Sequence, residues 1–265
     1  MNPQMTRVGI GLALAMTLVL THRAALQVPI TEDVRGEPPD KAAPRSDRTS
    51  QLAHDQLLEK SRRGRIDVYF VGDSIVRRWG ALDYPELLAN WKENFYGWNA
   101  GNFGWGADRT ENILWRLEHG ELDGVNPKVI VILGGTNNVG SQPGDDETVA
   151  GTVRGITAIV DVCRQKAPTA TIILTAIFPR NDNPAVLPTI NRINQGLAGL
   201  ADGGHVRFLN INDRLADANG VLVDGMTRIS VNDEMIDAGM ASDEMMTARR
   251  LRMKTITTIV ANRDP

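Results

Sequence analysis

Short apolar runs alternate with helical patterns along most of the chain. Four nearly continuous apolar runs are typical of strands buried on both faces, as in parallel sheets: residues 66–71, 129–133, 172–178 and 206–211. Residues 94–98 form a weaker, aromatic candidate strand. Apolar residues recur at helical spacing in four segments: 51–64, 109–118, 147–165 and 187–201. Strands that alternate with helices predict an α/β three-layer sandwich around a mostly parallel five-stranded sheet.

The first residues follow a different pattern. Arg7 precedes an uncharged run over residues 8–20, which is too short for a membrane span, since a spanning helix needs about 20 apolar residues. Such a run is typical of a secretory signal, although His22 or Arg23 would occupy a cleavage position that prefers a small residue. We predict a signal peptide over residues 1–25 and an exported protein, periplasmic or secreted in a bacterium. An uncleaved N-terminal membrane anchor is the alternative.

The remainder divides into a linker and a domain. Residues 26–50 contain four prolines among mixed charges and no periodic apolar pattern, which predicts an extended linker. Residues 51–262 hold every predicted strand and helix. In a chain of 265 residues, this stretch is long enough to form one domain with a sizeable core.

The composition is that of a soluble globular protein and excludes several classes. With 29 Lys and Arg against 32 Asp and Glu, the net charge of −3 provides no footprint for nucleic acid. Cys163 is the only cysteine, which excludes a disulfide scaffold, and no Cys/His cluster has the spacing of zinc ligands. We expect no metal, no cofactor, no nucleic-acid partner and no stable membrane insertion after processing. The oligomeric state stays open.

Residues with useful chemistry follow the predicted strands. In open α/β sheets, binding sites form beyond the carboxyl ends of the strands. Ser74 follows the first strand, where a serine can act as a nucleophile or, together with Asp73, cap a helix. The glycine-rich stretch 99–110 follows the second strand, and its backbone N–H groups can hold an anion or simply form a tight loop.

Asn137 follows the third strand. Its side-chain amide can donate a hydrogen bond into the cleft, or it can form an Asx turn. A hydroxyl, a backbone N–H and an amide donor are the parts of a serine acyl-transfer site, and the combination is more specific than any one of them. The pentapeptide GxSxG is absent, which argues against the α/β-hydrolase fold.

Three motifs occur in order and resemble blocks one, two and three of the SGNH, or GDSL-type, hydrolases: Gly72-Asp73-Ser74, Asn102-Phe103-Gly104 and Gly135-Thr136-Asn137-Asn138. The longer run 102–140 is similar to the branch that contains the catalytic subunits of platelet-activating-factor acetylhydrolase and secreted bacterial relatives. The resemblance implies a flavodoxin-like SGNH hydrolase fold. It also implies that Ser74 is the nucleophile, and that the N–H groups of Ser74 and Gly104 form an oxyanion hole with the Asn137 side chain.

The chain departs from the family pattern near its end. Members of the family carry Asp-x-x-His before the last helix, with His as the general base, but no histidine follows His205 here. His205 closes an Asp-x-x-His of its own, yet this loop enters a predicted strand, which places it at the opposite edge of the sheet from Ser74. The catalytic Asp and His are therefore unknown. Asp233, Asp237 and Asp243 are possible carboxylates, and the remaining histidines are His22, His54 and His119.

Three explanations of this departure stay open: an altered or frame-shifted tail, a weakened or inactive relative, and an unrecognised base. Two functions follow from them. The first is a serine carboxylester hydrolase that removes short acyl groups, acetyl above all, from a carbohydrate, lipid or small alcohol. The second is an inactive or impaired protein of the same fold that binds a carbohydrate or ester. Trp79 and Trp105 flank the first two motifs, where they can stack on a ligand or pack the loops.

Overall fold

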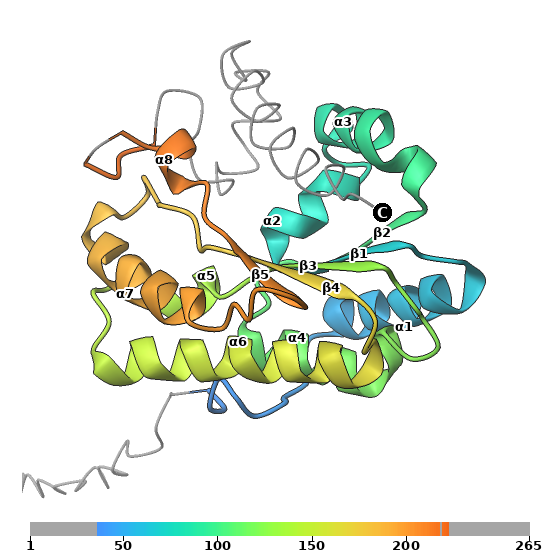
Figure 1. Cartoon of the computed structure of the whole chain (residues 1–265), viewed down its shortest axis with the longest axis horizontal. Helices are drawn as coiled ribbons and strands as arrows, with labels where there is room; N and C mark the ends of the chain where they lie inside the picture. The colour runs from blue at the N-terminus through green and yellow to red at the C-terminus, as the bar shows by residue number, and fades with distance from the viewer. Residues whose placement is uncertain (1–35, 218, 223–265) are drawn as a thin grey trace, which may run out of the picture. The chain divides into compact units, whose positions relative to one another are not determined.

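Five parallel strands form the central sheet of the protein (Figure 1). The computed structural model describes residues 36–217 and 219–222. The strands are β1 (Val68–Gly72), β2 (Ala100–Gly104), β3 (Val129–Leu133), β4 (Thr171–Thr175) and β5 (Val206–Leu209). Their order across the sheet is β2-β1-β3-β4-β5, and every neighbouring pair is parallel. This is the doubly wound, flavodoxin-like order, and it confirms the predicted fold class.

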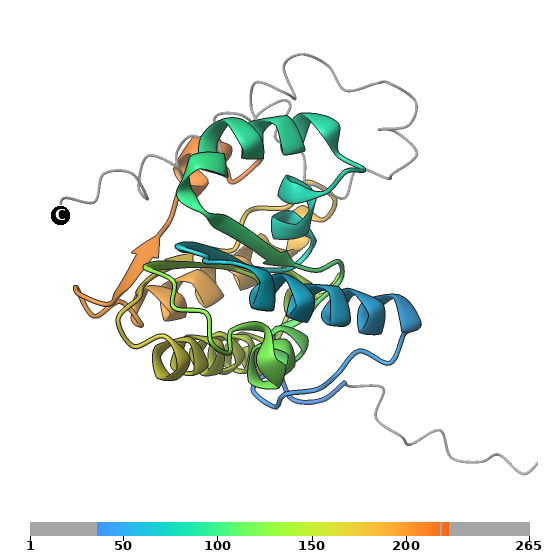
Figure 2. The same cartoon turned by 90° about the vertical axis from the view of Figure 1, so that its right-hand side faces the viewer.

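Helices cover both faces of the sheet and complete a three-layer sandwich (Figures 1 and 2). One face is covered by α1 (Arg48–Arg63), α4 (Thr110–Arg116), α6 (Asp146–Lys166) and α7 (Leu187–Ala198). The other face is covered by α2 (Ser74–Arg77), the 3-10 turn η1 (Arg78–Gly80), α3 (Pro85–Phe95) and α8 (Asn212–Leu215). Four short turns complete the described part: η2 (Tyr96–Trp98), the π-helical turn η3 (Leu117–Glu121), α5 (Thr136–Val139) and η4 (Pro184–Val186).

The strands are apolar at successive positions because both faces are covered. Along β1, Tyr69 and Val71 pack on the side of α1 and α4, whereas Val68 and Phe70 pack on the side of α2 and α3. All four side chains are buried. The predicted run 129–133 coincides with β3. The apolar residues that follow Thr175 are buried outside the strand, so the run predicted for β4 was too long.

The predicted second strand was wrong. Residues 94–98 lie at the end of α3 and in η2, and the observed strand begins at Ala100. Phe95 packs edge-on against Phe70 at 5.0 Å, so the aromatic residues belong to the helical layer rather than to the sheet. Asn99 then turns the chain with a φ of 50°. The observed strand contains two glycines, which weaken the strand pattern in the sequence.

The predicted helices occur close to their expected positions. α1 begins at Arg48 because Asp47 caps it: the Asp47 side chain accepts a hydrogen bond from the Ser50 N–H at 2.9 Å. α4 ends at Arg116, and the following turn η3 contains a kink at Gly120, which has a φ of 106°. Cap residues and glycines therefore set the ends of these helices, as expected for helix termini.

Residues 36–47 lie within the predicted linker and contact α4. The Pro39 carbonyl accepts a hydrogen bond from Thr110 Oγ1 at 2.9 Å, and the Ala43 N–H donates to the Glu111 carbonyl at 3.0 Å. This segment therefore runs along the helical layer, held by hydrogen bonds from its main chain.

Several predictions fall outside the described residues. They are the signal peptide over residues 1–25, the candidate carboxylates Asp233, Asp237 and Asp243, and the segment after Met226 in which the Asp-x-x-His block was expected. Within 36–217 and 219–222, no helix has the length and apolar character that a membrane span requires.

Candidate functional site

Ser74 is the first residue of α2 and follows the carboxyl end of β1. Asp73 caps the helix, because its Oδ1 accepts a hydrogen bond from the Ile75 N–H at 2.9 Å. Ser74 is half-buried. Gly72 permits the tight approach to β3, since a Cβ there would lie 1.9 Å from the Leu133 carbonyl oxygen. The local sequence thus assigns the capping role to Asp73 and leaves the Ser74 hydroxyl at the edge of the sheet where ligands bind.

Asn137 lies in α5, which follows the carboxyl end of β3. Its Nδ2 donates a hydrogen bond to the Asp108 carbonyl oxygen at 2.7 Å. The neighbouring Asn138 has a structural role: its Oδ1 accepts from the Thr110 N–H at 2.9 Å, and its Nδ2 donates to Glu111 Oε2 at 3.0 Å. Asn138 is buried and Asn137 is half-buried, so Asn137 is the amide with access to the sheet edge.

Gly104 is the last residue of β2, and its N–H is already engaged. This N–H donates to Asn102 Oδ1 at 3.0 Å, while Asn102 Nδ2 donates to the Val76 carbonyl at 2.6 Å. The structure therefore does not show Gly104 as the open donor that the family resemblance implied. Its absence of a side chain matters for packing instead, because a Cβ would lie 2.3 Å from the Arg77 backbone nitrogen.

The loop after β2 turns at Ala107, which has a φ of 61°. Among the non-glycine residues of the described ranges, only Ala107 and Asn99 have a positive φ. Such a backbone conformation costs a residue with a Cβ about 1–3 kcal/mol, and strained residues of this kind gather at functional sites. Sequence reasoning missed Ala107, because an alanine gives no signal of left-handed backbone.

The strand order brings these segments together. β1 lies between β2 and β3, and Gly72 is in register with Gly104 on one side and Leu133 on the other. The hydrogen bond from Asn137 to Asp108 joins the segments that follow β3 and β2. Ser74 follows β1, which lies between these two strands. A serine hydroxyl, an amide donor and a strained backbone turn therefore meet at one edge of the sheet.

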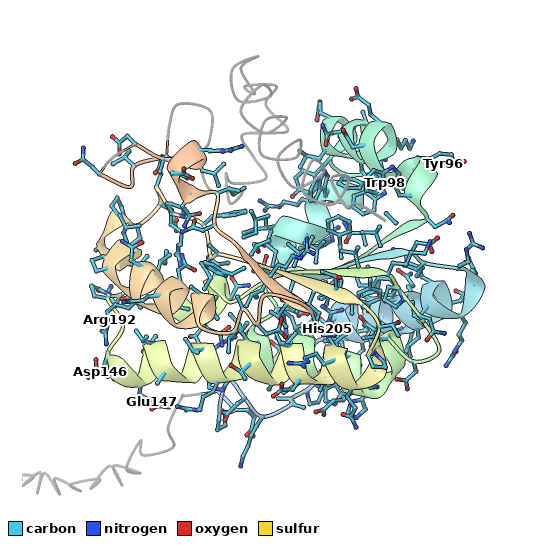
Figure 3. The ribbon with its side chains drawn as sticks, viewed as in Figure 1. Tyr96, Trp98, Asp146, Glu147, Arg192 and His205 are labelled. Atoms are coloured by element: carbon cyan, nitrogen blue, oxygen red, sulfur yellow. The ribbon has the colours of Figure 1, made fainter. Side chains whose placement is uncertain are left out.

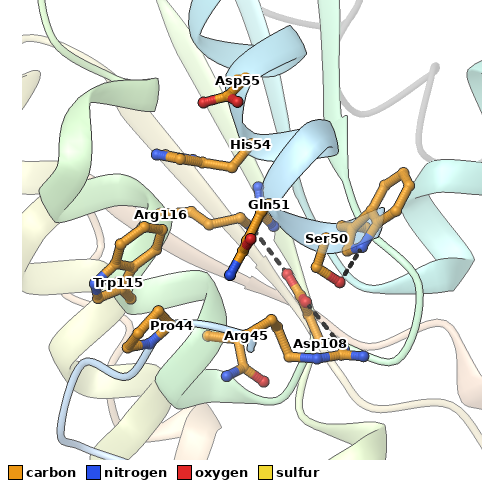
Figure 4. Close-up of a pocket in the computed structure, with 11 residues that line it drawn as sticks. Pro44, Arg45, Ser50, Gln51, His54, Asp55, Asp108, Trp115 and Arg116 are labelled. Atoms are coloured by element: carbon orange, nitrogen blue, oxygen red, sulfur yellow. Dashed lines mark hydrogen bonds and ion pairs between the residues drawn. The ribbon is translucent and has the colours of Figure 1, made fainter. Parts of the chain in front are cut away.

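A cluster of buried charged side chains lies next to this edge, and Figure 4 shows two of its members, Arg116 and Asp108. Arg116 Nε donates to Asp108 Oδ2 at 2.8 Å, and Arg116 Nη1 pairs with Glu121. The guanidinium also donates to the carbonyls of Phe103 at 3.1 Å and Gly72 at 3.3 Å. Burial raises the pKa of Asp108 to about 6, against the opposing attraction of Arg116. The cluster thus ties the ends of β1 and β2 to the loop that contains Asp108.

A cavity of about 250 Å³ lies between α1, α4 and the segment that precedes α1 (Figure 4). Arg45 and Trp115 are among its lining residues, and Asp108 forms part of its wall. Arg45 Nη1 donates to the Gly106 carbonyl at 3.2 Å and lies 3.6 Å from Asp108 Oδ1. Neither Ser74 nor Asn137 lines this cavity, so the cavity is separate from the candidate site.

The described histidines are held away from Ser74. His54 Nδ1 lies 2.8 Å from Glu121 Oε1, and His119 Nδ1 lies 2.8 Å from the Trp115 carbonyl oxygen. His205, labelled in Figure 3, immediately precedes β5, and its carbonyl accepts from the Ile172 N–H at 2.7 Å. It therefore lies at the amino edge of the sheet, opposite Ser74. The described part of the chain does not supply a histidine base.

The two tryptophans considered for ligand stacking differ in burial. Trp79 is buried between the sheet and α3, and its Nε1 donates to Asn90 Oδ1 at 3.2 Å. Trp105 is half-buried and donates to Ser50 Oγ at 2.9 Å. Trp79 is thus a core residue, and only Trp105 is partly accessible. In residues 36–217 and 219–222, no group of three or more His, Cys, Asp or Glu residues has a geometry that could hold a metal ion.

Comparisons with known proteins point to one family. A model of the GDSL-like lipase/acylhydrolase family matches residues 70–231. Human platelet-activating factor acetylhydrolase IB subunit alpha1 is 34% identical over 171 residues, which cover 64% of this chain and 69% of the relative. The human subunit alpha2 is 36% identical, again over 171 residues with 64% and 69% coverage.

Solved structures share the fold. A structure from Streptococcus pneumonia superposes with a TM-score of 0.56 at 22% identity, covering 77% of this chain and 92% of the other. A GDSL-like lipase from Bacteroides thetaiotaomicron gives a TM-score of 0.53 at 15% identity, with 77% and 98% coverage. The α/β fold and the sequence matches together define a GDSL-type hydrolase of ester bonds. The chain belongs to the GDSL-like lipase/acylhydrolase family, as its three motifs predicted.

Proposed function

We propose that the protein is an exported serine carboxylester hydrolase that removes short acyl groups, acetyl above all, from a carbohydrate, lipid or small alcohol. The observation that carries this proposal is the convergence of Ser74 and Asn137 at the carboxyl ends of β1 and β3. The human relatives support the choice of an acetyl group, since both are named acetylhydrolases. The export of the chain rests on the pattern of its first residues alone.

In the proposed reaction, Ser74 Oγ attacks the ester carbonyl carbon and loses its proton to a general base. The carbonyl oxygen becomes negatively charged in the tetrahedral intermediate. This intermediate collapses to acyl-Ser74 and releases the alcohol, which takes the proton back. Water then hydrolyses the acyl-serine by the same steps. No cofactor takes part in this scheme.

Three donors would stabilise the negative oxygen. They are the N–H of Ser74, the second hydrogen of Asn137 Nδ2, and a backbone N–H of the turn at Ala107. Asn137 Nδ2 carries two hydrogens, and only one is needed for its bond to the Asp108 carbonyl. We assign the third donor to the turn at Ala107 rather than to Gly104, because the Gly104 N–H is bonded to Asn102. Each donor of this type contributes roughly 3–4 kcal/mol to the transition state.

The general base is unassigned. No histidine follows His205 in the sequence, and this observation favours a second candidate function: a catalytically impaired or inactive protein that binds a carbohydrate or ester. General-base assistance contributes about 10²–10⁴-fold to the rate. A chain that lacks the base would therefore be a slow esterase or a binding protein.

The test is the intact mass of the protein after treatment with a fluorophosphonate probe. We expect a single adduct on the wild type and none on Ser74→Ala. Ser141→Ala is the matched control, since Ser141 is exposed and lies outside the site, and it should keep the adduct. Hydrolysis of p-nitrophenyl acetate that disappears in Ser74→Ala would exclude the binding protein. Absence of both adduct and turnover in the folded wild type would overturn the esterase proposal and leave the binder.

A further inference from the structure

Arg180 lies in the loop after β4, and only 7% of the residue is exposed. Its Nη1 donates to the Gly140 carbonyl at 2.8 Å and to the Thr136 carbonyl at 3.4 Å. Thr136 is the first residue of α5, and Gly140 is the residue that follows its last. One guanidinium thus binds both ends of the helix that carries Asn137.

α5 needs such support because it is a single turn. It has no side-chain cap at its start, and the flanking glycines have positive φ values, 99° at Gly135 and 74° at Gly140. Isolated helices this short are unstable in water, since nucleation costs more than one turn of hydrogen bonds returns. The position of α5 therefore depends on its tertiary partners.

The guanidinium is itself held in place. Arg180 Nε donates to Asp182 Oδ1 at 3.2 Å, and Nη2 donates to Asp182 Oδ2 at 3.0 Å. This two-point contact fixes the plane of the guanidinium, so that Nη1 points at the α5 carbonyls. A lysine has the same charge but not the planar arrangement of donors, and it cannot make these contacts together.

We propose that Arg180 is a positioning residue for Asn137. Arg180 holds the main chain of α5 from the side of β4, and the Asp108 carbonyl holds the Asn137 side chain from the side of β2. The inference rests on the proposed function, in which Asn137 Nδ2 stabilises the negative oxygen. A donor of this kind acts only when its position is accurate, and a displacement of about 1 Å can cost about 100-fold in rate.

The test is a double-mutant cycle between Arg180→Ala and Asn137→Ala, measured with p-nitrophenyl acetate. Arg180→Ala should lower kcat by roughly 10- to 100-fold with a smaller change in KM. The kcat of Arg180→Lys should lie between that of Arg180→Ala and that of the wild type. In the Asn137→Ala background, Arg180→Ala should have almost no further effect on kcat, because the group that it positions is gone. The rate of fluorophosphonate labelling is a second readout, since that reaction also builds negative charge on oxygen.

Arg192→Ala is the matched control. Arg192 is an exposed arginine of α7 that pairs with the exposed Asp146 of α6 (Figure 3) and takes no part in the contacts of Arg180 or Asn137, so Arg192→Ala should leave kcat unchanged. An equal loss of kcat from Arg180→Ala in both backgrounds would overturn the inference, because the effect would then not pass through Asn137. If Arg180→Ala fails to fold, Arg180→Lys or Asp182→Asn replaces it in the double-mutant cycle with Asn137→Ala.

The design separates this inference from the proposed function. Loss of activity in Ser74→Ala together with full activity in Asn137→Ala would keep the serine mechanism and overturn the role of Arg180. Full activity in Ser74→Ala would overturn the serine mechanism, and the positioning role with it.

Discussion

The side chain of Asn137 donates a hydrogen bond to the main-chain carbonyl of Asp108 at 2.7 Å. This contact joins the segment after β3 to the segment after β2, on either side of Ser74 at the end of β1. Asp108 is in turn held by Arg116 from the interior of the protein. The residue that accepts from Asn137 through its main chain is therefore bound through its side chain to the buried charges of the core.

Replacing Asn137 by alanine tests whether its side-chain amide stabilises the negative oxygen of the intermediate. Asn137→Ala removes the amide donor, and kcat for a short-chain ester should fall by about 10²–10³-fold while KM changes little. Asn94→Ala is the control, since Asn94 bonds the Asn90 carbonyl within α3, away from the sheet edge. Steady-state kinetics on both variants provide the measurement. Unchanged kcat in Asn137→Ala would remove Asn137 from the proposed site.

A methyl group at Gly104 should separate β2 from α2. Its Cβ would lie 2.3 Å from the Arg77 backbone nitrogen, so one of the two elements must move. Overpacking of this kind costs typically about 1–3 kcal/mol, and we expect Gly104→Ala to lose at least that much free energy of unfolding. Gly97→Ala is the matched variant, because a Cβ there meets nothing within 4 Å. In urea unfolding, the midpoint of Gly104→Ala should lie well below that of the wild type, and the midpoint of Gly97→Ala should stay close to it. Equal midpoints for the two variants would contradict the packing argument.

Asp108 should make stability depend on pH. Its folded-state pKa of about 6 lies above the ordinary value of 3.8, so the folded protein holds the proton more tightly than the unfolded chain. This contribution is fully present below the unfolded pKa and is lost as pH rises through 6. Between about pH 4 and pH 7, the wild type should therefore lose up to about 3 kcal/mol relative to Asp108→Asn.

The measurement for Asp108 is the free energy of unfolding across that pH range for both proteins. Asp108→Asn also removes the ion pair with Arg116, so its absolute stability is not the criterion. The criterion is the difference between the two proteins in how steeply the free energy of unfolding changes with pH. Parallel slopes would show that Asp108 takes up no proton on folding in this range.

Cys163 should be inert in the folded protein. It lies on the buried face of α6 and is fully enclosed in the core, and burial raises the pKa of its thiol to about 12. At about pH 8 almost no thiolate is present, and the thiolate is the reactive form. Ellman's reagent should therefore report no thiol in the native protein and one per chain in concentrated guanidinium chloride, since the sequence has a single cysteine. Rapid reaction of the native protein would contradict the buried position.

The sequence by itself predicted the parallel α/β architecture, four of the five strands, the helical layers and the family. Strands covered on both faces must be apolar at successive positions, so β3 could be located from residues 129–133 without any structural information. The motifs around Ser74 and Asn137 could be found for a related reason. Both residues follow directly on strands, and parallel strands bring their carboxyl ends to a common edge.

Other features depend on contacts between distant parts of the chain, and only the tertiary structure decided them. Gly104 of β2 lies closely against α2, where a Cβ would clash with Val76 and Arg77, and no local sequence pattern records that packing. The Gly104 N–H is engaged because the Asn102 side chain turns back toward it while also binding α2. Arg180 reaches α5 across 40 residues of sequence. Apolar periodicity reports burial of a residue, whereas hydrogen-bond partners are set by how the elements pack.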